Sequence, residues 1–203
     1  MKRIIIIMLT ILIIFIGVIL VFQNTNNYNE EENNNEVPPQ VEETKEPEKQ
    51  ETTVNTPIAK HGTLKLQGTN IVDKNGEVFA LKGISTHGVQ WFPQYINEQA
   101  FKYMYENWGI NTVRLAMYSD PNAGYTQASR ETVKRGIEYA TNVGLYVIVD
   151  WHILSDNNPN MYKSEAISFF KEIATQYKDN ENIIYEICNE PNGNVEWERD
   201  IKP

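Results

Sequence analysis

A carboxylate beside an amide, late in the chain, is the clearest indication of chemistry. Residues 183–191 read Ile-Ile-Tyr-Glu-Ile-Cys-Asn-Glu-Pro, an apolar strand that runs into Asn189 and Glu190 before Pro191 stops it. In parallel α/β barrels, reactive side chains follow the C-terminal ends of the strands. Glu190 is therefore the predicted catalytic residue, an acid–base group, and Asn189 supplies a hydrogen-bond donor and acceptor beside it.

Hydrolysis of a glycosidic bond by such an acid needs a second carboxylate, and neither neighbouring acid fits. Glu186 lies four residues earlier on the same strand, about 13 Å away at roughly 3.3 Å per residue. The carboxyl groups of glycosidases stand about 5–5.5 Å or about 6.5–9.5 Å apart. Glu186 is instead predicted to be an ion-pair residue. Asp150 is predicted to orient His152 or to pair with a cation.

Arg114 is a cation in a strand otherwise built for burial, so it requires a carboxylate nearby. Two interpretations stay open: a structural ion pair, or a cation that keeps a catalytic carboxylate ionised. His87 and His152 are either satisfied loop histidines or members of a site. With Glu190 they form no compact metal-binding motif, so we predict neither a metal nor a cofactor.

Aromatic residues are concentrated where loops are expected. Packing is their usual role, but a row of aromatic rings beside an acid also suits the apolar faces of sugar rings. The residues expected to lie together at this loop face are Trp91, Phe92, Tyr95, Tyr118 and Trp151.

Strand-like and helix-like patterns alternate through the second half of the sequence. A hairpin is expected over 64–81 with its turn at 73–76, and its second strand leads into 83–87. Helices are expected over 97–107, 129–142 and 164–177, and strands over 112–118, 145–149 and 183–188. Asn97 is the predicted cap of the first helix, and Gly144 ends the second. In the third, we expect Ile167, Phe170 and Ile173 to point inward.

This alternation predicts an α/β fold with a parallel sheet. Because the polar residues follow the strands, we expect a (β/α)8 TIM barrel of which only the first four β/α units are present in this chain. An open doubly wound sheet is the alternative, but no glycine-rich phosphate loop follows the first strand.

The N-terminal third has a different composition. Lys2 and Arg3 precede an apolar run over 4–22, so residues 1–22 are predicted to be a signal peptide or an uncleaved signal-anchor transmembrane helix. Residues 23–57 are predicted to be a disordered acidic linker, and 58–203 the folded domain. The net charge of −9 argues against nucleic acid as a partner. We expect Cys188, the only cysteine, to be a buried small hydrophobe.

Four segments together resemble family 5 glycoside hydrolases, specifically bacterial endo-β-1,4-glucanases. They are GISTHGVQWF at 83–92, RLAMY at 114–118, DWHIL at 150–154 and NEPNG at 189–193. The resemblance extends over residues 61–203 and implies a retaining double displacement with Glu190 as proton donor and later general base. It implies that Arg114, His87, His152, Asn189 and Tyr118 surround the reaction centre and that Trp91 is a sugar platform.

The resemblance also implies what this chain lacks. The family's nucleophile is a glutamate on the seventh strand, so we expect the sequence to be cut off before it and to be inactive by itself. The expected whole is an extracellular, membrane-anchored or secreted monomer that hydrolyses β-glucan. A mannanase or other β-glycanase of the same family is one alternative. A noncatalytic cell-surface carbohydrate-binding protein is the other.

Overall fold

The computed structural model of the chain describes residues 55–202. A short helix, α2 (Pro57–His61), comes first. Thr56 caps it, and its Ile58 amide donates to the carbonyl of Gly144, 3.1 Å away. The sequence did not predict this helix, which overlaps the C-terminal end of the expected 23–57 linker. Within residues 55–202, no helix is long and apolar enough to cross a membrane; residues 4–22 and 23–54 lie outside the described part.

The expected hairpin is present but displaced. Its regular ladder joins β1 (Lys65–Gln67) to β2 (Asn70–Val72), with Gly68 in the turn at φ 63°. The predicted turn at 73–76 also forms, yet it is followed only by a single antiparallel bridge between Val72 and Val78. The Asp73 carboxylate accepts the Asn75 and Glu77 amides, which gives this segment a loop in place of a longer ladder.

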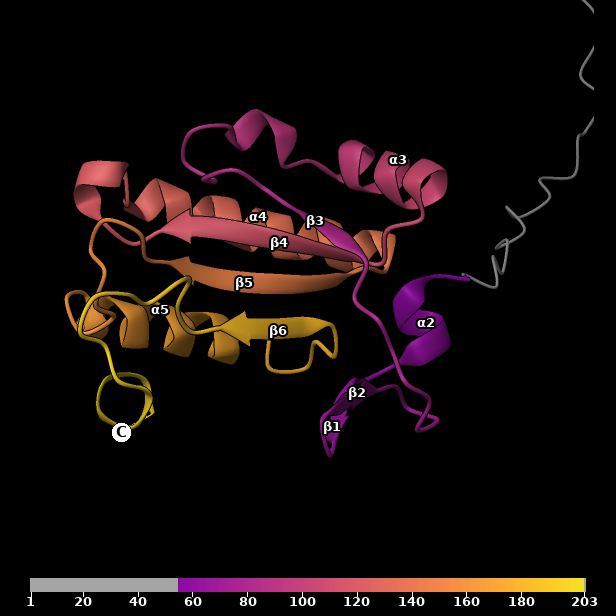
Figure 1. Ribbon diagram of the computed structural model, residues 1–203. Coiled ribbons are helices and arrows are strands. Elements are labelled where there is room, and N and C mark those ends of the chain that lie inside the picture. Colours follow the sequence, from indigo (N-terminus) through magenta and orange to yellow (C-terminus); the bar gives the residue numbers. More distant parts are fainter. Residues whose placement is uncertain (1–54, 203) are drawn as a thin grey trace, which may run out of the picture. The chain divides into compact units, whose positions relative to one another are not determined.

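The centre of the domain is a four-stranded parallel sheet, as predicted (Figure 1). The strand order follows the chain, and Tyr118 pairs with His152 while Asp150 pairs with Glu186. The last strand ends two residues before the expected position. The strands are β3 (Gly83–Ser85), β4 (Thr112–Tyr118), β5 (Tyr146–His152) and β6 (Ile183–Glu186).

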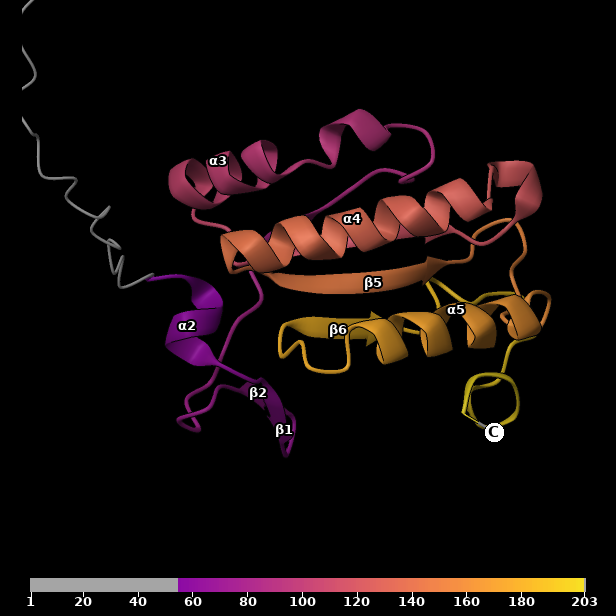
Figure 2. The ribbon, with the colours of Figure 1, turned by 180° about the vertical axis from the view of Figure 1, so that it is seen from behind.

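The connections between the strands are helical. The predicted Asn97 cap is confirmed, because its Oδ1 accepts the Ala100 amide, and Gly144 ends the second helix at φ 80°. The helices α4 and α5 lie behind the sheet in Figure 1 and in front of it in Figure 2. The elements are α3 (Glu98–Trp108), α4 (Gln127–Val143) and α5 (Lys163–Gln176), with the one-turn segments η1 (Pro93–Tyr95), η2 (Pro121–Ala123) and η3 (Trp197–Ile201).

The inward face of α5 differs from the prediction. Phe169 and Ile173 are fully buried, Phe170 is half-buried, and Ile167 is 59% exposed. Six residues separate Ile167 from Ile173, about 600° at roughly 100° per residue, which places Ile167 about a third of a turn away from the buried stripe. The prediction for Ile167 was therefore wrong.

The two faces of the sheet have different side chains. Alternate residues of β4 and β5, such as Leu115 and Val149, are buried beneath the helices. The residues between them, including Arg114 and Asp150, point to the opposite face. This alternation brings the polar residues of neighbouring strands side by side near the C-terminal end of the sheet.

Candidate active site

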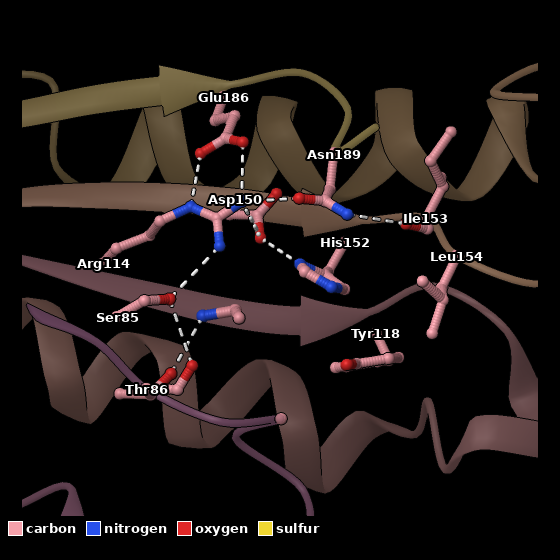
Figure 3. A network of polar contacts seen from close by, with 12 residues as sticks. Ser85, Thr86, Arg114, Tyr118, Asp150, His152, Ile153, Leu154, Glu186 and Asn189 are labelled. Carbon is pink, nitrogen blue, oxygen red and sulfur yellow. Dashed lines mark hydrogen bonds and ion pairs between the residues drawn. The ribbon is translucent and has the colours of Figure 1, made fainter. Parts of the chain in front are cut away.

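Arg114 is the centre of a polar network on this face (Figure 3). Its Nε and Nη2 atoms donate to Oε2 and Oε1 of Glu186 at 2.7 and 2.6 Å, a two-pronged contact between β4 and β6. Nη1 donates to the Ser85 hydroxyl at 3.2 Å. The predicted ion-pair role of Glu186 is confirmed, and Arg114 has the carboxylate that it requires.

Asp150 is the second carboxylate of the network and is fully buried. Its Oδ2 lies 2.9 Å from Arg114 Nη2 and 2.7 Å from His152 Nδ1, so Asp150 both orients the imidazole and pairs with a cation, as predicted. Burial raises the pKa of Asp150, and the contacts with His152 and Arg114 oppose that rise. The hydrogen bonds that Arg114 donates to Glu186 raise the pKa of Arg114, which keeps it a cation.

Asn189 joins this network to the predicted acid. Its Oδ1 accepts from Arg114 Nη2 at 3.0 Å, and its Nδ2 donates to the carbonyl of Ile153 at 3.1 Å. Its amide is thereby held in one orientation. Glu190 follows immediately, exposed, with a positive φ of 32°. Along the chain, β6 is therefore followed by Asn189, which belongs to the network, and then directly by the predicted acid Glu190.

Aromatic rings form a continuous row beside the network. The ring of Tyr118 lies 4.3 Å from that of His152 and 4.5 Å from that of Trp91, between centroids. His87 continues the row, 4.9 Å from Trp91 and 5.5 Å from Phe92. Trp91 is 43% exposed and Phe92 45%, so both retain surface for a ligand.

Trp151 does not belong to this row, contrary to the prediction. It is fully buried on the helix side of the sheet, where its ring packs against Phe169 and Tyr125 at 5.7 and 5.3 Å. Successive residues of a strand face opposite sides. Since Asp150 and His152 point into the site, Trp151 between them must point away.

Gln90 is a further residue of the site, and the sequence interpretation missed it. Its side-chain amide donates to the carbonyl of Tyr118 at 3.0 Å and accepts the Tyr118 amide at 3.4 Å, so it behaves as a strand partner. It thereby holds the loop that carries Trp91 against the end of β4. The feature of the sequence that could have indicated this role is the position of Gln90 between a glycine-containing segment and Trp91.

Two other predictions concern metals and the thiol. Within residues 55–202, no group of three His, Cys, Asp or Glu side chains is arranged to hold a metal ion. Cys188 is half-buried, and burial together with Asp150 and Glu186 raises the pKa of its thiol. Cys188 packs against the core, but it is less buried than predicted.

Relatives of the chain are endoglucanases. It is 47% identical over 145 residues to an endoglucanase of Clostridium saccharobutylicum and 42% identical over 165 residues to endoglucanase A of Butyrivibrio fibrisolvens. These alignments include 70% and 78% of this chain but 32% and 38% of the relatives. The chain thus spans about a third of the length of these curated relatives.

Solved structures give the same result. The catalytic domain of Thermobifida fusca endoglucanase Cel5A superposes with a TM-score of 0.66 at 36% identity, covering 70% of this chain and 47% of that one. These neighbours are (β/α)8 barrels, which confirms the predicted fold class. A family model described as cellulase (glycosyl hydrolase family 5) matches residues 72–203. The chain belongs to the cellulase family, glycosyl hydrolase family 5.

Proposed function

We propose that this chain supplies the acid–base half of a retaining β-1,4-glucanase, with Glu190 as proton donor and general base. The observation that carries the proposal is the position of Glu190. It is exposed at the C-terminal end of a parallel strand, next to an asparagine whose amide is fixed by Arg114. A related structure was determined in complex with cellotetraose, which supports a β-1,4-glucan as the substrate.

In this proposal, neither acid of the Arg114 network serves as the nucleophile. Asp150 and Glu186 are the two acids of the network, and each forms an ion pair with Arg114, at 2.9 and 2.6 Å. Asp150 is also fully buried, without access to a sugar. The 203-residue chain by itself is therefore expected to show no glycosidase activity.

The aromatic row provides the surface for the sugar. Trp91 is 43% exposed and packs against Tyr118 beside the Arg114 network, and pyranose rings pack on such aromatic surface through their C–H groups. In this proposal, His87, Phe92 and His152 complete the binding surface around the scissile bond. None of these contacts depends on a cofactor.

The test replaces Glu190 with Ala in the complete gene product. Turnover of carboxymethylcellulose should fall about 10²–10⁴-fold, because its leaving oxygen needs a proton. The dinitrophenolate of a dinitrophenyl cellobioside departs without that proton, so the first step on this substrate should be largely spared. Added azide should enter the vacated space and yield a β-glycosyl azide. Glu196→Ala, which removes an exposed acid paired with Arg199, is the matched control and should change neither reaction.

Three outcomes separate the proposal from its rivals. Equal losses on both substrates, with no effect of azide, would show that Glu190 is not the acid–base residue. Faster turnover of mannan than of cellulose by the unsubstituted protein would indicate a mannanase. Binding of cellulose without any turnover would indicate a carbohydrate-binding protein.

We also propose that the enzyme acts outside the cell, attached to the membrane through its N-terminal segment. The support is the sequence alone, where Lys2 and Arg3 precede an uncharged run over 4–22.

A further inference from the structure

The segment that carries Glu190 is held by the end of β5 and by the loop that follows it. The Asn189 amide donates to the carbonyl of Trp151 at 3.2 Å, and the Asn189 side chain donates to that of Ile153 at 3.1 Å. On the other side of Glu190, the Asn192 amide donates to the carbonyl of Asn157 at 3.1 Å. The loop therefore contacts the chain both before and after the acid.

Asn157 and Glu190 share an unusual backbone conformation. They are the two non-glycine residues with positive φ among residues 55–202, at 52° and 32°. Such a conformation is unfavourable for a residue with a side chain and persists only where the surroundings impose it. Asparagine accepts it more readily than most residues, and glycine accepts it freely.

The segment around Asn157 is closely hydrogen-bonded. The neighbouring Asp156 is 3% exposed; its Oδ1 accepts the Leu154 amide at 2.7 Å and its Oδ2 accepts the Ser119 hydroxyl at 2.5 Å. The Asn157 amide donates to the carbonyl of Leu154 at 3.2 Å. These bonds close a tight loop that leaves the carbonyl of Asn157 directed at Asn192.

A second hydrogen bond links Asn192 to the backbone of Glu190. The side-chain amide of Asn192 donates to the carbonyl of Glu190 at 3.1 Å. A change in the direction of the Asn157 carbonyl would release Asn192, and with it the peptide that fixes the backbone of Glu190. Because the Glu190 side chain is exposed, its aim depends on this backbone.

We propose that Asn157 is a positioning residue for Glu190: its left-handed backbone directs a carbonyl to the Asn192 amide and so fixes the direction of the acid. The inference rests on the proposed function of Glu190. The Asn157 side chain donates only within its own loop, to the carbonyl of Ser155 at 2.9 Å. The inference therefore predicts that the backbone conformation at position 157 matters more to the reaction than this side-chain contact.

Two substitutions separate these features. Asn157→Gly keeps the positive φ, whereas Asn157→Val opposes it, because a β-branched residue is a true outlier there. In the complete gene product, Asn157→Val should lower kcat on carboxymethylcellulose about ten- to a hundredfold with KM little changed. The first step on a dinitrophenyl cellobioside, which needs no acid, should fall much less. Asn157→Gly should retain both rates.

Hydrogen exchange supplies a measurement that does not depend on activity. The Asn192 amide should exchange about tenfold faster or more in Asn157→Val and remain protected in Asn157→Gly. Equal exchange in the two variants, or equal losses by Asn157→Val on both substrates, would overturn the inference. If the unsubstituted protein is inactive, the proposed function fails, and the exchange comparison alone decides the role of Asn157.

Discussion

Removal of the Arg114 guanidinium should leave two carboxylates without their shared cation. Arg114→Met keeps the length and the apolar part of the side chain, so the loss is mainly electrostatic. Asp150 loses a partner at 2.9 Å and Glu186 loses two hydrogen bonds, at 2.6 and 2.7 Å. Asn189 also loses the donor that fixes its amide.

The magnitude depends on how much water replaces the cation. Breaking a buried ion pair costs about 3–5 kcal/mol, whereas an exposed pair contributes about 0–1 kcal/mol. The side chain of Asp150 is 0% exposed and that of Glu186 is 31% exposed, so most of the cost comes from Asp150. We expect the free energy of unfolding to fall by about 3 kcal/mol near pH 7.

The pH dependence carries a specific sign. Burial already raises the pKa of Asp150 above 3.8, and Arg114 opposes that rise, so the variant should have a still higher folded-state pKa. A raised carboxyl pKa contributes stability that is present below 3.8 and is lost as the pH rises through the folded value. The deficit of Arg114→Met should therefore be smaller near pH 4 than near pH 7, by about 1.4 kcal/mol for each unit of further shift.

Urea unfolding of the complete gene product across this range measures the effect. The double variant Arg114→Met/Asp150→Asn is the control, because a neutral amide no longer needs a cation. It should recover much of the stability near pH 7 and lose the steep pH dependence. An equal deficit at both pH values, or no recovery in the double variant, would refute an electrostatic role for Arg114.

Three further predictions follow from other contacts. The hydrogen bond from His61 lowers the pKa of Asp73, so the Asp73 carboxylate contributes stability above pH 3.8 that is lost as the pH falls through the folded-state pKa. Asp73→Asn should therefore weaken the loss of stability toward acid pH. An unchanged loss would contradict this. Gln90→Leu should raise KM for cellulose about fivefold at constant kcat, because the loop of Trp91 loses two hydrogen bonds; a fall in kcat alone would be inconsistent. The full-length product should fractionate with membranes and be released by protease cutting within 23–57, whereas a mature N-terminus after residue 22 in the culture supernatant would show a cleaved signal peptide.

The sequence was sufficient for the elements whose signals are local. The strand over 112–118 was predicted with the bounds of β4, because its apolar residues continue without interruption except at Arg114. Asn97 and Gly144 were predicted because capping depends on one residue and its immediate neighbours. The ion-pair role of Glu186 also followed, since the distance along a strand excluded the alternative.

Features that depend on facing direction were harder to predict. Trp151 was assigned to the loop face from its residue type, although its position between Asp150 and His152 requires the opposite face. Ile167 was assigned inward on apolarity, and the helix rotation places it outside. The bonds of Gln90 and Asn157 join segments distant in the chain, so no pattern within one segment indicates them.

The position of α2 has a consequence for the modular design of such enzymes. The Tyr105 hydroxyl donates to the carbonyl of Asn55 at 2.7 Å, and Ile58 is bonded to Gly144, just before β5 begins. The described chain therefore begins at the end of the sheet where the strands start, while Glu190 follows the end where β6 stops (Figure 1). Seven residues of strand, about 20 Å, separate these ends. A tag, spacer or binding module fused ahead of residue 55 would therefore join the domain at the end of the sheet opposite to Glu190, the residue proposed to act as the acid–base group.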